Sequence, residues 1–178
     1  MTIIATDLDG TIYKGQTLID GVKNGVLEII NAGIEIYFTT NNSSQSPSEI
    51  KDKLDNLLQL NLDMTKIITP LVIFQNLYSG NSKDIYIYGS DNLINFINKM
   101  NMNVTNLENA ELILIGRKEE NNNSEINQIL KNVSLGKEIL CLNKDLTFPT
   151  ELGERPGNGA VVKIIEDNLS IDIPTLGK

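Results

Sequence analysis

The sequence contains no histidine and no tryptophan, and it has one cysteine among 178 residues. Without histidine there is no Ser-His-Asp triad, no Cys-His dyad and no zinc site built on imidazole. A single cysteine cannot form a disulfide within the chain, and Cys141 lies in an apolar run that predicts a buried core residue. Any catalysis must therefore use carboxylates, hydroxyls, amides, lysines or a metal ion bound by oxygen.

Positive charge and long hydrophobic runs are also scarce. Fifteen Lys and Arg against 23 Asp and Glu give a net charge of −8, and the basic residues are scattered, which argues against nucleic acid as a partner. No apolar run approaches the roughly 20 residues that span a bilayer, and the start of the chain lacks the basic region of a signal peptide. We therefore expect a cytoplasmic protein that binds neither nucleic acid nor membrane.

Alternating strand and helix patterns predict an α/β protein with parallel strands. In the first half we expect strands at 2–6, 34–40 and 67–68 and helices at 19–32, from 46 to 58 and from 70 to 78. After the small polar segment 79–82 the pattern restarts, with strands at 84–88, 112–115 and 139–142 and helices at 92–100 and 124–133. The sequence thus predicts a second α/β module at about 81–170.

Three segments contain residues suited to chemistry. Asp7 and Asp9 follow a β-branched strand and precede Gly10, so both carboxylates are expected at the carboxyl end of a parallel strand, where ligands gather. Two such close charges favour a hard cation such as Mg²⁺ or a shared proton; a solvated acidic turn is the competing interpretation, and its place after a buried strand argues against it. The polar run 39–44 follows the next strand, and Lys178 follows a short, mainly apolar segment. Taken alone, the polar run would be interpreted as a turn and Lys178 as part of a solvated tail.

Together these segments resemble the haloacid dehalogenase superfamily, specifically its 4-nitrophenylphosphatase-like sugar phosphatases with a large α/β cap. Residues 7–11 match the nucleophile motif, 39–43 the hydroxyl motif and 177–178 the lysine motif. The turns expected of the cap are found at 88–90, 114–116, 142–145 and 155–160. The resemblance implies a Rossmann-like core made of 1–80 and 171–178, with the cap inserted at 81–170.

The resemblance implies a Mg²⁺-dependent phosphatase of small phosphorylated metabolites, such as a sugar or glycerol phosphate. Asp7 would attack phosphorus, and Asp9 would protonate the leaving group and then activate water. Thr40 would hydrogen-bond the phosphoryl group, and Lys178 would neutralise the charge around Asp7. A carboxylate oxygen of Asp7 and the backbone carbonyl of Asp9 would hold Mg²⁺.

Other residues are expected to contact the substrate. They are Gly10, Thr11, Asn41, Asn143, Asp145 and Asn158. The last three are expected to set specificity from the cap, and the glycine-rich stretch 156–160 is expected to be a loop that lets backbone approach the ligand closely. Two ordinary turns between cap elements are the competing interpretation.

The chain departs from the family pattern after Lys178, where members continue to an acidic motif with further Mg²⁺ carboxylates. We expect that this chain is a truncated form of a longer protein or covers only part of one. The alternatives are that another chain completes the fold or that the protein is a degenerate member of the family. The first strand would then have an unpaired edge, which predicts low solubility and little activity for 1–178 alone.

Two other classes of function stay open. One is a non-catalytic phosphate-binding or scaffold protein, and the other is a receiver-like phosphoacceptor domain, which has no reason to contain an inserted module. We also expect a homodimer through the cap, for which the apolar segments 85–88 and 112–115 offer strand material.

Overall fold

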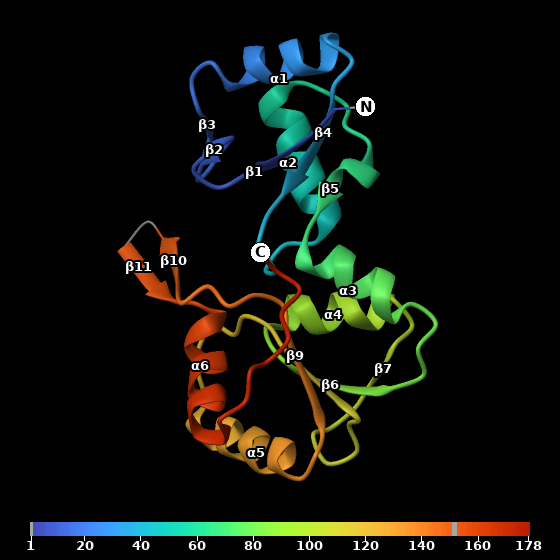
Figure 1. The fold of residues 1–178 in the computed structure, drawn as a ribbon, viewed down its shortest axis with the longest axis vertical. Coiled ribbons are helices and arrows are strands. Elements are labelled where there is room, and N and C mark those ends of the chain that lie inside the picture. The colour runs from blue at the N-terminus through green and yellow to red at the C-terminus, as the bar shows by residue number, and fades with distance from the viewer. Residues whose placement is uncertain (1, 151–152) are drawn as a thin grey trace.

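The computed structural model describes residues 2–150 and 153–178 of the chain. They form two α/β units stacked along the long axis of the molecule, each built on its own sheet (Figure 1). The strand order is β1-β4-β5 in the sheet of the first unit and β7-β6-β8-β9 in that of the second. All neighbours within these two sheets are parallel, so the predicted α/β class is confirmed.

The first unit consists of short strands, two helices and one 3₁₀ turn. Its elements are β1 (Ile3–Asp7), β2 (Tyr13–Lys14), β3 (Thr17–Leu18), α1 (Val22–Asn31), β4 (Glu35–Thr39), α2 (Pro47–Leu58), η1 (Met64–Lys66) and β5 (Ile67–Ile68). In the β1–β4 pair Asp7 lies opposite Thr39, so the two strands end at the same level. The residues that follow them therefore meet at one edge of the sheet.

Local signals set the ends of α2. Ser46 caps its N-terminus by accepting a hydrogen bond from the Glu49 amide at 3.3 Å, and Glu49 accepts one from the Ser46 amide at 2.7 Å. This capping box, with Pro47 in the first turn, satisfies amides that the helix leaves free. The helix ends at Gln59, which has a positive φ of 55°.

Both helices of the first unit pack on one face of its sheet. Phe38 of β4 and Leu54 of α2 are completely buried, and Val26 of α1 is 3% exposed in the same cluster. The opposite face is open, since Ile3 of β1 is 57% exposed. In the described part of the chain β1 pairs with β4 alone, so it forms the edge of this sheet.

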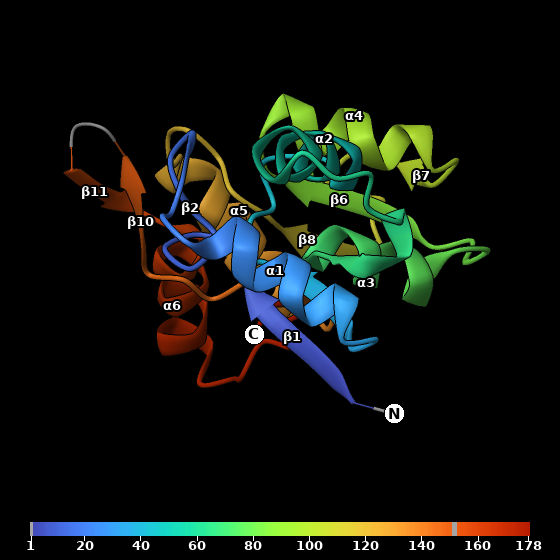
Figure 2. The same cartoon turned by 90° about the horizontal axis from the view of Figure 1, so that it is seen from above.

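The second unit has helices on both faces of its sheet. Its elements are α3 (Pro70–Tyr78), β6 (Asp84–Tyr88), α4 (Asp91–Lys99), β7 (Asn103–Val104), β8 (Leu112–Ile115), α5 (Asn123–Ser134), β9 (Glu138–Cys141), β10 (Thr147–Thr150), β11 (Gly153–Pro156) and α6 (Asn158–Leu169). Helices α5 and α6 pack in one hydrophobic cluster and α3 and α4 in the other, and Figure 2 shows the first pair to the left of β6 and β8. Side chains of β8 alternate between the two resulting hydrophobic clusters.

The hydrophobic contacts group some residues differently from the expected division at residues 80 and 170. Leu71 and Phe74 of α3 pack into the core of the second unit. Near the C-terminus, Cys141 donates a backbone hydrogen bond to Pro174 at 3.0 Å and Leu176 donates one back to Cys141 at 3.1 Å. The segment 174–176 therefore runs beside β9 before the chain reaches the first unit.

One expectation about the second unit needs correction. The stretch 156–160 is not a loop, because β11 ends at Pro156 and α6 begins at Asn158. Strand β8 lies between β6 and β9, and β6 pairs with β7 at Asp84 and Ile85; the expected homodimer through the cap stays a prediction. None of the helices in the described ranges has the length and apolar character needed to cross a membrane.

Candidate active site

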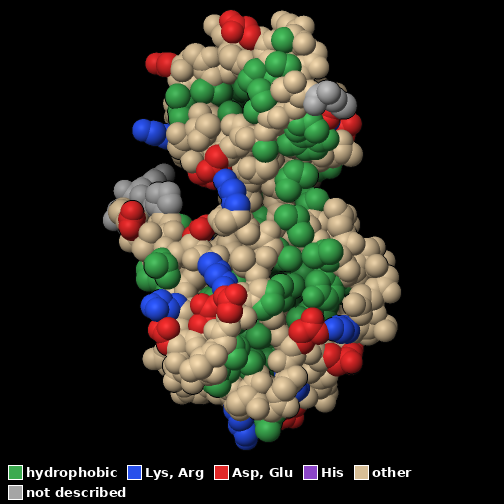
Figure 3. Space-filling model, viewed as in Figure 1, with side chains coloured by type: hydrophobic (Ala, Val, Ile, Leu, Met, Phe, Trp, Pro, Cys, Tyr) green, Lys and Arg blue, Asp and Glu red, His purple; other side chains and the backbone are tan. Residues whose placement is uncertain are grey.

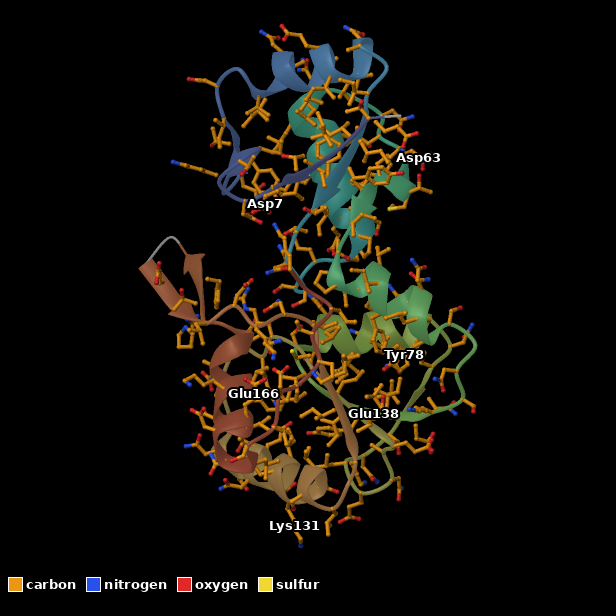
Figure 4. The ribbon with its side chains drawn as sticks, viewed as in Figure 1. Asp7, Asp63, Tyr78, Lys131, Glu138 and Glu166 are labelled. Carbon is orange, nitrogen blue, oxygen red and sulfur yellow. The ribbon has the colours of Figure 1, made fainter. Side chains whose placement is uncertain are left out.

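Asp7 lies at the carboxyl end of β1 and faces the second unit (Figure 4). Its Oδ1 accepts a hydrogen bond from the Leu8 amide at 2.8 Å and pairs with Lys178 Nζ at 2.5 Å. Within the described residues the other carboxylate oxygen, Oδ2, accepts no hydrogen bond. The structure thus brings together the first and last of the predicted catalytic residues, 171 positions apart in sequence, and leaves one oxygen of Asp7 free.

Asp9 lies two residues further on, in the turn after β1. Partial burial is the largest influence on this carboxyl and raises its pKa, and the nearby charge of Asp7 adds to the rise. The ammonium groups of Lys53 and Lys178 and a hydrogen bond from Thr40 act in the opposite direction. A raised pKa favours the protonated form, which is the form a general acid needs.

Thr40 follows β4 and is 5% exposed. Its amide donates to Ile68 of β5 at 3.1 Å, and its Oγ1 accepts a hydrogen bond from the Asn42 amide at 3.0 Å. These bonds fix the hydroxyl at the same end of the sheet as Asp7 and Asp9, as the sequence predicted from the parallel strands.

A cavity of about 350 Å³ lies between the two units at this edge of the first sheet. Figure 3 shows the surface hollowed where the units meet, with acidic and basic side chains along the hollow. The lining residues are Asp7, Asp9, Thr40, Asn41, Asn42, Ser43, Ser44, Arg117, Asn143, Asp145, Thr147, Phe148, Gly157, Asn158 and Lys178. All four predicted catalytic residues therefore line one space.

Asn41 joins three segments at the mouth of this cavity. Its Nδ2 donates to Asp145 Oδ1 at 2.9 Å and to the Lys178 carbonyl at 3.0 Å. Its Oδ1 accepts from the Lys178 amide at 2.9 Å. Asn41 thus positions Lys178 and connects the first unit to the second, and its amide is already engaged by protein groups.

Asn143 and Asn158 of the second unit connect separate segments through side-chain hydrogen bonds. Asn143 donates to the Asn41 carbonyl at 2.8 Å. Asn158 is 4% exposed, and its Nδ2 donates to the carbonyls of Ile115 at 3.2 Å and Asn143 at 2.9 Å. Its Oδ1 is the one buried side-chain oxygen or nitrogen without a partner in the part of the chain that the structure describes. These bonds align the loop after β9 with the end of β8.

Two glycines allow α6 to approach that loop. A Cβ on Gly157 would lie 2.2 Å from the Asp145 carbonyl oxygen, and one on Gly159 would lie 2.1 Å from that of Lys144. The sequence suggested that these glycines let backbone approach a ligand, but the backbone they approach is that of the protein itself.

Gly10 and Thr11 are placed away from the cavity lining. The Gly10 amide donates to the Tyr13 carbonyl at 2.8 Å, and the Thr11 amide donates to that of Leu8 at 3.2 Å. Gly10 has a φ of +81°, which favours glycine over residues with a side chain. In this structure both residues form the turn that follows the two carboxylates.

The sequence analysis missed two residues of the second-unit wall, Arg117 and Phe148. The Arg117 guanidinium carbon lies 3.6 Å from the centre of the Phe148 ring, and Arg117 Nη1 donates to Ser44 Oγ at 3.1 Å. No motif marks either residue. A usable signal was the scarcity of arginine, since Arg117 and Arg155 are the two arginines in the chain.

A family model for haloacid dehalogenase-like hydrolases matches residues 4–103, more than half of the chain. This chain belongs to the haloacid dehalogenase-like hydrolase family. The match contains Asp7, Asp9, Thr40 and Asn41 and ends before the second-unit wall of the cavity. Family membership therefore rests on the first unit and the beginning of the second.

Relatives of this hydrolase extend the likeness over nearly the whole chain. The acid sugar phosphatase of Staphylococcus saprophyticus is 26% identical over 174 residues, which are 97% of this chain and 67% of that protein. A thermostable p-nitrophenylphosphatase of Bacillus stearothermophilus is 27% identical with a TM-score of 0.77, covering 98% of this chain and 68% of the other. A p-nitrophenyl phosphatase of Archaeoglobus fulgidus, 22% identical, has the same fold with a TM-score of 0.86 over 98% of this chain and 67% of its own.

Proposed function

We propose that this chain is a phosphatase that hydrolyses small phosphate monoesters through a phosphoaspartyl intermediate. The observation that carries the proposal is the arrangement of Asp7, whose Oδ1 is held by Lys178 and the Leu8 amide, with Asp9 in the same cavity. The names of the relatives, acid sugar phosphatase and p-nitrophenylphosphatase, support a phosphate ester as the substrate.

In the first step the free oxygen of Asp7 attacks the phosphorus of the ester. An acyl phosphate forms, the bond between phosphorus and the leaving oxygen breaks, and the proton of Asp9 passes to that oxygen. Lys178 offsets the negative charge of Asp7 and the phosphate, and the Thr40 hydroxyl donates a hydrogen bond to the phosphoryl group. The raised pKa of Asp9 suits this step because the carboxyl retains its proton to higher pH.

In the second step water hydrolyses the acyl phosphate. Asp9, now ionised, takes a proton from the water molecule as its oxygen attacks phosphorus, and the bond between Asp7 and phosphorus breaks. Inorganic phosphate is released and both carboxyl groups return to their starting states. Each aspartate thus has a distinct role, as nucleophile and as acid-base group.

The residues present fit Mg²⁺ as the metal. The donors would be oxygens, namely the carboxylate oxygen of Asp7 that does not attack phosphorus and the backbone carbonyl of Asp9, and Mg²⁺ is commonly held by one or two carboxylates together with waters and substrate phosphate. No group of three or more potential ligand side chains occurs in the described part of the chain, so no larger acidic cluster adds to these two donors there. When bound, Mg²⁺ would neutralise part of the charge on the phosphate oxygens.

Release of 4-nitrophenol from 4-nitrophenyl phosphate tests the proposal. We expect the whole protein to show turnover that depends on added Mg²⁺ and falls at least about a thousandfold in Asp7→Asn, because the nucleophile is lost. Asp20→Asn is the matched control, since Asp20 is an exposed carboxylate of the same unit outside the cavity. Acid quenching followed by mass spectrometry should find one phosphoryl group on the peptide that contains Asp7.

Retention of wild-type turnover in Asp7→Asn would refute the nucleophile assignment. Phosphate binding without turnover in the wild-type chain would support a scaffold, and a phosphoaspartate that persists without hydrolysis would support a phosphoacceptor domain.

A further inference from the structure

We infer that Arg117 forms a second anion site in the cavity and that the preferred substrate contains, besides the reacting phosphate, a further carboxylate or phosphate group. This inference rests on the proposed function and narrows its substrate class. The first anion site lies at Asp7 and Lys178, in the first unit, and Arg117 follows β8 in the second unit and lines the same cavity. One small molecule with two anionic groups can therefore reach both sites.

The charge balance of the cavity favours an anion beside Arg117. Within the described residues Arg117 has no ion pair, whereas Lys178 pairs with Asp7 and the neighbouring Lys118 pairs with Glu125 at 2.5 Å. Asp145, the acidic residue that the second unit contributes to the cavity lining, accepts a hydrogen bond from Asn41 at 2.9 Å. A partly buried cation without a carboxylate partner gains most when an anion from outside supplies one.

The environment of Arg117 strengthens this electrostatic preference. Burial lowers the pKa of the guanidinium, the positive charge of Arg155 lowers it further, and the exposed Glu119 acts in the opposite direction. The guanidinium remains charged at neutral pH, because arginine is not deprotonated in proteins. A bound carboxylate or phosphate would relieve both the lost hydration and the repulsion from Arg155.

The geometry of Arg117 suits an oxyanion with two acceptor oxygens. Its guanidinium lies over the Phe148 ring at 3.6 Å, which fixes the orientation of the planar group. Of its five N–H donors, one bonds to Ser44 Oγ at 3.1 Å. Donors of the guanidinium remain for a two-pronged hydrogen bond to a carboxylate or phosphate, a geometry that lysine does not offer.

Binding of matched phosphonates tests the inference without depending on turnover. The probes are ω-phosphonocarboxylates with chains of two to six carbons, each paired with the alkylphosphonate that lacks the carboxylate; matching α,ω-bisphosphonates replace the carboxylate by a second phosphorus group. Isothermal titration calorimetry measures the dissociation constants. For at least one chain length we expect the second anionic group to tighten binding about 10- to 100-fold, as hydrogen bonds between charged groups do.

Three variants assign the effect to Arg117. In Arg117→Gln the gain from the second anionic group should vanish while the alkylphosphonates bind within about threefold of wild type, and in Arg117→Lys the gain should be intermediate. Arg155→Gln is the matched control, because Arg155 is exposed and lines a smaller neighbouring cavity. It should retain most of the gain, because only the repulsion from Arg155 is removed. If Arg117→Gln fails to fold, Arg117→Lys decides.

The inference is overturned if no chain length shows a gain, if the gain survives in Arg117→Gln, or if Arg155→Gln removes it equally. A lower melting temperature in Arg117→Gln with an unchanged gain would mean that Arg117 only joins the two units through Ser44. Comparing the carboxylate and bisphosphonate series identifies which anion is preferred. A failure to hydrolyse any ester would refute the proposed function. The calorimetric result would still decide, independently, whether Arg117 binds a second anionic group.

Discussion

The two walls of the cavity are built in different ways. On the first-unit wall Asp7 ends β1 and Thr40 directly follows the adjacent parallel strand β4, so strand register alone brings them together. On the second-unit wall Arg117, Asn143 and Phe148 come from separate segments, joined by side-chain hydrogen bonds and a ring contact. The reacting groups thus depend on local chain geometry, and the wall that would contact the rest of the substrate depends on tertiary packing.

The walls also differ in charge. The first has two carboxylates with Lys178 paired to one of them, whereas the second has Arg117 without a carboxylate partner among the described residues. Substitutions on the first wall should therefore change the rate for every substrate. Substitutions on the second should change substrate preference or stability.

The largest effect in this comparison is expected for Lys178→Gln. Loss of the ammonium group removes the charge that offsets Asp7 and the phosphate, so kcat for 4-nitrophenyl phosphate should fall about 100- to 1000-fold. Lys163→Gln is the control, because Lys163 is an exposed lysine paired with Asp167 on α6. Steady-state kinetics provide the measurement, and equal rates in the two variants would contradict the role of Lys178.

An intermediate effect, on stability, is expected for Gly159→Ala. The added Cβ would lie 2.1 Å from the Lys144 carbonyl oxygen, so backbone must move, and we expect a loss of about 1–3 kcal/mol in the free energy of unfolding. Gly25→Ala in α1 is the matched control, since no atom lies within 4 Å of its Cβ position and alanine favours helix by about 0.5–1 kcal/mol. The midpoint of urea unfolding should fall in Gly159→Ala and rise in Gly25→Ala. A shift in the same direction for both variants would contradict this prediction.

The smallest effect is expected for Lys53→Gln. The ammonium of Lys53 lowers the pKa of Asp9, so its removal raises that pKa further. The protonated acid then persists to higher pH, and the alkaline limb of kcat/KM should shift upward by about 0.3–1 pH unit at low salt. Lys51→Gln is the control because Lys51 pairs with Asp55 at 2.5 Å on the same helix. A downward shift, or equal shifts in both variants, would contradict the assignment.

The strands and helices of the first unit could largely be predicted from the sequence, and so could its reacting residues. Apolar and β-branched runs gave β1 and β4, and Ser46 with Pro47 gave the start of α2, because these signals act between neighbouring residues. The small hairpin β2–β3 was not anticipated. Its two-residue strands are too short to produce a periodic pattern.

In the second unit local signals were less reliable. Pro156, Gly157 and Gly159 are typical of a turn, yet α6 begins at Asn158 and has no side-chain hydrogen bond at its N-cap. The helix begins there because its glycines fit closely against the carbonyls of Lys144 and Asp145. That requirement arises only once β9 and α6 are packed together.

The sequence by itself determined that this chain is an α/β protein with two carboxylates at the end of its first strand, because hydrophobic periodicity and strand order are local properties. Only the tertiary structure decided that Asn41 would join Asp145 and Lys178, which are 104 and 137 residues away, and that Arg117 would lie over Phe148 in the same cavity. Contacts of this kind depend on how the two units pack against each other, and no spacing along the chain encodes them.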